Sequence, residues 1–101
     1  MAAEHGVLVT LEAGTDRQDE VARFLREGLT SVLSEIGTTT WYSYRITESL
    51  FGVYATFADA ESRRAYLDGE FAKNLDAAAG DILAGPPRVD EIGVVASKAA
   101  V

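Results

Sequence analysis

The sequence has no cysteine, only one histidine and only two prolines. The absence of cysteine excludes disulfides, thiolate metal sites and cysteine nucleophiles. A zinc site without cysteine needs several histidine or carboxylate ligands, and the single histidine, His5, precedes the first predicted strand. We therefore expect His5 at the surface, and we expect neither a metal site nor a Ser-His-Asp catalytic triad.

The sequence also lacks the roughly 20 consecutive apolar residues that a membrane-spanning helix needs. Its first residues carry neither a basic segment nor an apolar run, so we expect no signal peptide, no membrane partner and a cytoplasmic location. Basic side chains are few, 9 against 16 acidic ones, which gives a net charge of −7. Because such a chain repels phosphate backbones, we expect no nucleic-acid partner. The charge is typical of a solvated surface, with attraction of a cationic ligand as the alternative.

A chain of 101 residues is long enough for one domain. We expect the whole chain, residues 1–101, to form that single domain, with an ordered core from about residue 7 to about residue 96. A domain of this size buries a modest core, so association with a second copy would add to its stability.

Residues 38–57 are rich in β-branched and aromatic side chains and are interrupted once, at Glu48 and Ser49. This pattern predicts a β-hairpin with a two-residue turn, in which Ile46 lies opposite Phe51. We expect the more apolar face to turn toward the helices, and it holds Tyr42, Tyr44, Ile46, Phe51, Val53, Ala55 and Phe57. The other face then holds Trp41, Ser43, Arg45, Gly52, Tyr54 and Thr56. A shift of one residue in the pairing would exchange the two faces.

The remaining periodicities predict two strands and three helices around this hairpin. The strands are expected at residues 7–12 and 88–96, and the helices at about residues 17–36, at 60–67 and from 71 to about 83. Thr15 and Asp59 are the predicted caps of the first two helices. The order is that of a ferredoxin-like α+β fold, β-α-β-β-α-β with one additional helix: a four-stranded antiparallel sheet with helices on one face.

Helices on one side of a four-stranded antiparallel sheet leave the other side uncovered. In the predicted register the uncovered side carries Trp41, Arg45 and Tyr54. An exposed surface of this kind usually marks an interface. We therefore expect a homodimer that packs through this sheet face.

Three stretches of the sequence resemble the antibiotic biosynthesis monooxygenase family of dimeric α+β barrels. They read GTTTWY at residues 37–42, LFGVYATFAD at 50–59 and LAGPP at 83–87. The resemblance extends over nearly the whole chain and implies a pocket between the helices and the sheet of each subunit. Some members of this family oxidise aromatic polyketides with molecular oxygen and without metal or flavin. Others bind and degrade haem, and others have no established activity.

Members of this family commonly end the third strand with an aromatic residue and carry a histidine nine residues later. The corresponding positions in this chain are Phe57 and Tyr66. Haem-degrading members use that histidine as the iron ligand, so the tyrosine implies that this chain does not carry out haem chemistry. We accordingly expect no cofactor.

The resemblance and the residues together suggest candidates for the pocket. Tyr66 is the candidate catalytic residue, because a phenol there would hydrogen-bond a substrate hydroxyl or ketone, and simple ring packing is the alternative. The candidate substrate-binding residues are Tyr42, Tyr44, Phe57, Phe71 and Asn74. Core packing is the alternative for the four aromatic residues, and a solvated helix surface is the alternative for the asparagine.

Two functions remain open at this point. One is a cofactor-independent monooxygenase that acts on a small aromatic substrate, polyketide-like or quinol-like, in the helix-sheet pocket. The other is a dimeric domain that binds a small molecule or serves a structural role without catalysis. The sequence leaves the choice open because function resides in the site and not in the fold.

Overall fold

The fold comes from a computed structural model that describes residues 5–98. Its elements in chain order are β1 (His5–Glu12), α1 (Gln18–Leu33), β2 (Thr38–Arg45), β3 (Leu50–Phe57), α2 (Ala60–Leu67), α3 (Glu70–Ile82) and β4 (Arg88–Gly93). The strands form one sheet in the order β2-β3-β1-β4, and each neighbouring pair is antiparallel. This arrangement confirms the predicted ferredoxin-like α+β fold.

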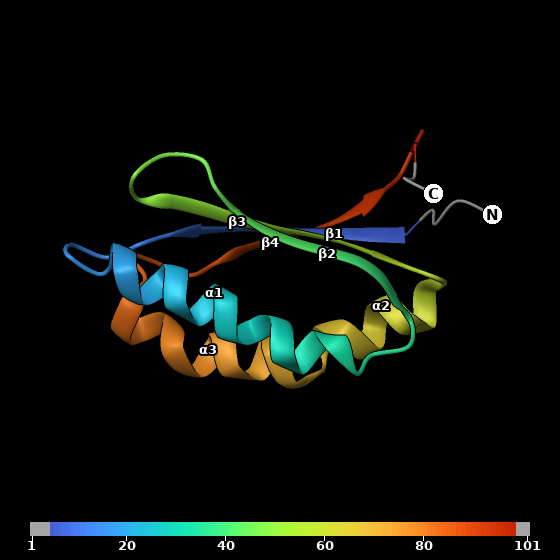
Figure 1. The fold of residues 1–101 in the computed structure, drawn as a ribbon, viewed down its shortest axis with the longest axis horizontal. Helices are drawn as coiled ribbons and strands as arrows, with labels where there is room; N and C mark the ends of the chain where they lie inside the picture. The colour runs from blue at the N-terminus through green and yellow to red at the C-terminus, as the bar shows by residue number, and fades with distance from the viewer. Residues whose placement is uncertain (1–4, 99–101) are drawn as a thin grey trace.

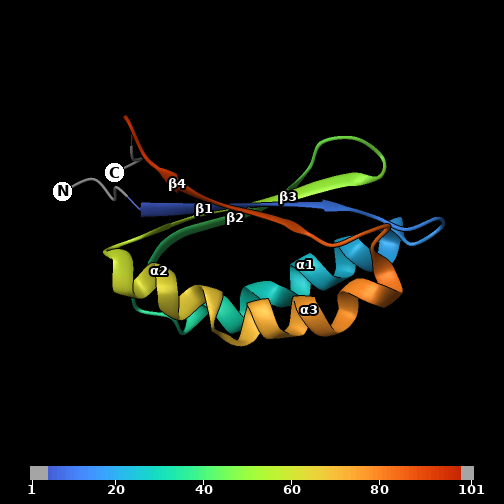
Figure 2. The ribbon, with the colours of Figure 1, turned by 180° about the vertical axis from the view of Figure 1, so that it is seen from behind.

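The molecule has two layers, with the three helices on one face of the sheet (Figures 1 and 2). The loop between β2 and β3 rises from the sheet on the side opposite the helices, and so does the chain that follows β4. Over residues 5–98, every helix is too short or too polar to cross a bilayer. The sheet face away from the helices is therefore open, with raised segments at its two ends.

The core lies between the sheet and the helices and follows the period-two pattern of the two central strands. Alternate residues of β1 are fully buried, among them Val7 and Leu11, and on β3 Val53 is fully buried as well. The helices cover them with the apolar stripes that the sequence predicted. The helical core residues are Val21, Leu25, Val32, Tyr66, Phe71, Leu75 and Ile82.

The pairing of β2 with β3 differs from the predicted register by one residue. Arg45 lies opposite Phe51, and Ser43 lies opposite Val53. The prediction was right for β3, whose apolar residues Phe51, Val53, Ala55 and Phe57 are buried on the helix side, and wrong for residues 41–45 of β2. Trp41, Ser43 and Arg45 are on the helix side, whereas Tyr42 and Tyr44 are on the open side.

The cause is a longer connection than the predicted two-residue turn. The backbone N–H of Ile46 donates to the carbonyl of Leu50, so residues 47–49 form the loop. The hydroxyl of Thr47 accepts hydrogen bonds from the backbone N–H groups of Ser49 and Leu50, which satisfies donors that the turn would otherwise leave free. Because side chains alternate along a strand, one extra loop residue moves all of β2 to the opposite face.

Tyr42 and Tyr44 are therefore not in the helix-sheet interior as predicted. The Tyr42 side chain is 61% exposed on the open face. The ring of Tyr44 lies across Gly52 of the neighbouring strand, where a Cβ would come within 2.5 Å of the tyrosine Cζ. The aromatic ring covers the backbone that the glycine leaves bare, a packing known to stabilise sheet glycines.

Helix α1 is shorter at both ends than predicted. Arg17 is its N-cap and makes no side-chain capping bond, because the chain turns at Gly14, whose carbonyl accepts from the Arg17 backbone N–H. Thr15 lies in that turn and is not the cap. At the other end Leu33 is 74% exposed and Ile36 is 99% exposed. The apolar stripe predicted as far as residue 36 therefore packs only as far as Val32.

The second half of the chain follows the prediction more closely. Asp59 caps α2 by accepting a hydrogen bond of 2.8 Å from the backbone N–H of Ser62. The bounds of α2 are those predicted, and α3 ends within a residue of the expected position. β4 ends at Gly93 instead of residue 96, and Val95 beyond it is fully exposed.

One helix glycine is required by close packing. A Cβ on Gly28 of α1 would lie 2.6 Å from the ring of Phe71 on α3. Alanine normally favours a helix by about 1 kcal/mol over glycine, but overpacking costs about 1 to 3 kcal/mol. The difference predicts that Gly28→Ala lowers the free energy of unfolding by up to about 2 kcal/mol in urea denaturation, instead of raising it as an alanine normally does in a helix.

Gly80→Ala is the matched control. Gly80 lies in α3, and a Cβ there would meet no atom within 4 Å. This substitution should raise the free energy of unfolding by about 0.5 to 1 kcal/mol. Equal effects of the two substitutions would contradict the packing of Phe71 against Gly28.

Candidate functional site

Tyr66, the predicted catalytic residue, lies inside the helix-sheet layer. Helix α2 carries its side chain into the core, where it is 2% exposed. The indole Nε1–H of Trp41 donates to the Tyr66 hydroxyl over 3.0 Å. The Tyr66 ring is stacked on Phe71, with 6.0 Å between ring centroids, and is tilted against Phe57 at 5.1 Å. The interior around this phenol is therefore filled by aromatic side chains.

The surroundings of Tyr66 keep its phenol neutral. Burial raises its pKa from 10.0 to about 12, although the hydrogen bond from Trp41 opposes the shift. A tyrosine that binds ferric haem must be a phenolate with an open side toward the iron. Burial and the surrounding rings oppose both conditions, so the position does not fit a haem ligand. A catalytic role for Tyr66 remains a prediction, and this environment favours the packing alternative.

Of the other predicted pocket residues, only Phe57 and Phe71 contact Tyr66. Phe57 and Phe71 are in the core, which is one of the two positions that the sequence allowed. Tyr42 and Tyr44 belong to the open face of the sheet. Asn74 is exposed on α3 and lines neither of the two hollows described below, which favours the alternative of a solvated helix residue.

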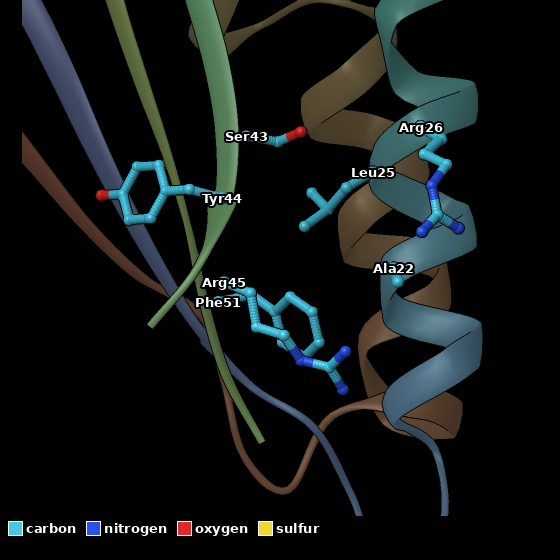
Figure 3. Close-up of a pocket in the computed structure, with 7 residues that line it drawn as sticks. All are labelled: Ala22, Leu25, Arg26, Ser43, Tyr44, Arg45 and Phe51. Atoms are coloured by element: carbon cyan, nitrogen blue, oxygen red, sulfur yellow. The ribbon is translucent and has the colours of Figure 1, made fainter. Parts of the chain in front are cut away.

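A cleft of about 220 Å³ lies instead between α1 and β2. It is lined by Ala22, Leu25, Arg26, Ser43, Tyr44, Arg45 and Phe51 (Figure 3). Leu25 and Ser43 point toward one another across it, whereas the Tyr44 ring points away. The observed register creates this cleft, because it turns Ser43 and Arg45 toward α1.

The guanidinium of Arg45 is the best-positioned polar group of the cleft. Its Nε and Nη2 donate to the backbone carbonyl of Glu48 over 3.2 and 2.8 Å. Its Cζ lies 4.8 Å from the centroid of the Phe51 ring, in a cation–π contact. Arg26 lies on α1 beside the cleft, and its side chain runs along the helix (Figure 3). The cleft thus combines an apolar floor with two cationic side chains.

Of the residues that line this cleft, the sequence predicted only Tyr44 as a site residue, and Arg45 was assigned to the dimer face. The spacing of Ala22 and Arg26 places both on one helix face, but nothing in the sequence shows that β2 lies beside that face. Within residues 5–98 no group of three or more His, Cys, Asp or Glu side chains is placed to hold a metal ion.

A second hollow lies near the end of α1. It is lined by Glu35, Ile36, Gly37, Thr38, Ser62 and Ala65. The carboxylate of Glu35 accepts a hydrogen bond of 2.9 Å from the Thr38 hydroxyl, so its main polar group already has a partner. We therefore assign the α1–β2 cleft as the candidate site.

The sequence and the structure were compared with those of known proteins. The sequence matches no protein-family model and no curated protein. Among solved structures, the chain is similar to NE2512, a protein of unknown function from Nitrosomonas europaea, with 33% identity and a TM-score of 0.94 over 98% of this chain and 96% of that one. It is also similar in fold to a "putative antibiotic biosynthesis monooxygenase" from Caulobacter crescentus CB15, with 21% identity and a TM-score of 0.79 over 93% and 92% of the two chains.

The chain is likewise similar in fold to a "putative antibiotic biosynthesis monooxygenase" from Nitrosomonas europaea, with 14% identity and a TM-score of 0.80 over 91% of this chain and 99% of that one. At these identities the likeness to the two monooxygenase-like proteins establishes the fold. The likeness therefore confirms that this chain has the fold predicted from its resemblance to that family. It does not show whether the chain catalyses a reaction.

The Tyr66 environment predicts a pH-dependent loss of stability. Because the folded state raises its pKa from 10.0 to about 12, the neutral phenol stabilises the fold below pH 10, and this contribution is lost as the pH rises through 12. Tyr66→Phe should cost about 1 kcal/mol near neutral pH, because the Trp41 indole loses its acceptor. The variant should also lose less stability than the wild type between about pH 8 and about pH 11 in urea denaturation.

Tyr42→Phe is the control, since the Tyr42 side chain is exposed. It should keep the pH dependence of the wild type. If Tyr66→Phe retained that dependence in full, the buried hydroxyl would not be its source.

Proposed function

Since the chain belongs to the same family as NE2512 from Nitrosomonas europaea and has the fold of antibiotic biosynthesis monooxygenases, we propose that it binds a small molecule in the cleft between α1 and β2. The observation that carries this proposal is the lining of the cleft. Leu25 and Phe51 form an apolar floor, and Ser43, Arg26 and Arg45 supply polar groups at its edge. A mostly apolar hollow with a few polar groups is typical of a ligand site.

The position of the proposed site follows from the filled interior. Trp41, Tyr66 and Phe71 occupy the space between helices and sheet, where the sequence predicted the pocket. A ligand there would have to displace close-packed rings, which is costly in a core of this kind. The edge of the layer, where β2 passes α1, needs no such displacement.

Oxidation of the bound molecule is the second candidate function. It is favoured by the fold shared with proteins described as monooxygenases and by the two arginines, which would stabilise a substrate anion. A substrate of the anthrone or quinol type would itself supply the electrons. For an anthrone, the CH2 group becomes C=O, one atom of O2 enters the product and the other leaves as water, so the four electrons lost by carbon reduce O2. No cofactor takes part in this balance.

We further propose that two copies pack through the open face of the sheet. The face carries Leu8, Thr10, Tyr42, Tyr44, Tyr54 and Ile92. Of the three residues that the sequence predicts for this interface, Tyr54 is on the open face, whereas Trp41 and Arg45 are on the helix side and Tyr42 and Tyr44 take their place. Tyrosine is enriched at the centres of interfaces. The raised loop and the chain after β4 bracket this face and would flank a second copy.

Filling the cleft tests the proposed function. Ala22 is half-buried in the cleft wall, so the ring in Ala22→Phe would occupy the ligand space. We expect the wild type to bind at least one member of a panel of anthrones, quinols and aromatic acids in calorimetry, and the variant to bind it at least about tenfold more weakly. Oxygen uptake followed in the same samples separates oxidation from binding alone.

Ala77→Phe provides the matched control, because Ala77 is exposed on α3 and outside the cleft. It should bind like the wild type, and circular dichroism should show both variants folded. Unchanged binding by a folded Ala22→Phe protein would place the ligand elsewhere.

The proposed dimer is tested by a charge on the open face. Tyr42→Asp should raise the dissociation constant of the dimer at least about tenfold, because a buried carboxylate at an interface lacks a partner. Light scattering coupled to size exclusion measures this at micromolar concentrations. Ile36→Asp, at a fully exposed position on the helical side, should leave the dimer intact. A wild-type protein that is a single subunit under these conditions would contradict the dimer.

A further inference from the structure

We infer that the α1–β2 cleft selects an amphipathic monoanion, an aromatic carboxylate, whose carboxylate binds Arg45 and Arg26 and whose ring lies on Leu25 and Phe51. This inference rests on the proposed function and adds the chemical class of the ligand. It is carried by three features: the charge of the cleft, the fixed geometry of Arg45 and the apolar surface that continues from the cleft.

The cleft is a cationic spot on an acidic protein. The chain has a net charge of −7, and Arg17, Arg63 and Arg88 each lie in an ion pair with a carboxylate. Arg26 and Arg45 have no ion-pair partner among the carboxylates of residues 5–98, which is also true of Arg23 and Arg64. The cleft differs in having both of its arginines in a lining without any carboxylate. Two guanidinium groups that line the same cleft without a carboxylate favour an anion from outside the chain.

Arg45 is held in place before any ligand binds. Two of its five N–H donors are used by the carbonyl of Glu48, and the Phe51 ring packs against the guanidinium. Because these contacts already order the Arg45 side chain, less conformational entropy is lost when a ligand binds. The remaining N–H donors, on Nη1 and Nη2, are available to the oxygens of a carboxylate. Arg26 is exposed on α1 beside the cleft and adds a second, movable donor.

The apolar floor of the cleft continues along α1 away from the arginines. Leu29 and Leu33 follow Ala22 and Leu25 on the same side of the helix, because residues three and four apart share a face. Both leucines are exposed although they are apolar. On β2, Trp41 lies two residues before Ser43 and on the same face, so it extends the opposite wall. An amphipathic ligand would cover this apolar surface with its ring system.

A flat aromatic acid fits these features better than a compact inorganic anion. Phosphate or sulfate would satisfy the arginines but would leave the exposed Leu29 and Leu33 in water. A neutral aromatic would cover the apolar surface but would give up the charge-assisted hydrogen bonds, which are roughly twice as strong as neutral ones. Because the cleft is open to solvent, its attraction for an anion should weaken as salt screens the charges.

The test compares 2-naphthoate with its neutral counterpart 2-naphthamide by isothermal titration calorimetry on the full chain. We expect the wild type to bind the carboxylate about tenfold more tightly than the amide, and the difference to shrink at high salt. Arg26→Gln and Arg45→Gln should each weaken naphthoate binding several-fold and leave naphthamide binding nearly unchanged. Inorganic phosphate should not compete at concentrations that saturate naphthoate.

Arg64→Gln is the matched control, since Arg64 is exposed on α2 and outside the cleft but carries the same charge. It should bind naphthoate like the wild type. Because Arg45 also bonds the hairpin loop, Arg45→Lys is included as a variant that keeps the charge but loses the planar fork; it should bind with intermediate affinity. Circular dichroism identifies any variant that has lost the fold.

Equal affinity for naphthoate and naphthamide would overturn the choice of an anion and leave a small-molecule site standing. If Arg64→Gln weakened naphthoate binding as much as Arg26→Gln, the effect would be net charge and the inference would also fail. If naphthoate and naphthamide both failed to bind and Ala22→Phe changed the binding of no other ligand, the proposed function itself would be contradicted.

Discussion

The pairing of β2 with β3 is the constraint on which the rest of this structure depends. The hydrogen bond from the Ile46 N–H to the Leu50 carbonyl places the loop at residues 47–49 and thereby decides which side of the sheet each residue of β2 occupies. Trp41 is turned to the helices, where its indole reaches the Tyr66 hydroxyl. Side chains of the same strand also build one wall of the α1–β2 cleft. Core, cleft and open face are thus three consequences of one register.

The aromatic interior explains why the candidate site lies at an edge. Trp41, Phe57, Tyr66 and Phe71 form a connected group of rings between the sheet and the helices. Gly28 allows the Phe71 ring to approach α1 closely enough to close this space. Proteins described as putative monooxygenases share this fold. In this chain, the space between helices and sheet where the sequence predicted a pocket is filled by packed aromatic side chains. The surface that remains for a ligand is the line where the edge strand β2 passes α1, and its polar groups are arginines.

Much of the fold could be predicted from the sequence, because its signals are local. The strand and helix order, the Asp59 cap and the buried face of β3 depend on period and capping chemistry that neighbouring residues carry. The facing of β2 could not be predicted, because aromatic residues occupy both of its faces and the period of two fits either choice. The length of the loop between β2 and β3 decides which way β2 faces. That length depends on hydrogen bonds made by the side chains of Thr47 and Arg45, which composition does not show. Arg45 was therefore assigned to the wrong face, and Arg26 was missed because nothing local in the sequence shows that β2 lies beside α1.

Nuclear magnetic resonance of the β2–β3 hairpin tests this register most directly. Cross-strand nuclear Overhauser contacts between backbone protons should pair Ser43 with Val53 and Trp41 with Ala55. Contacts that pair Tyr44 with Val53 and Tyr42 with Ala55 would contradict it. They would return both tyrosines to the helix side, remove Trp41 from Tyr66 and abolish the cleft.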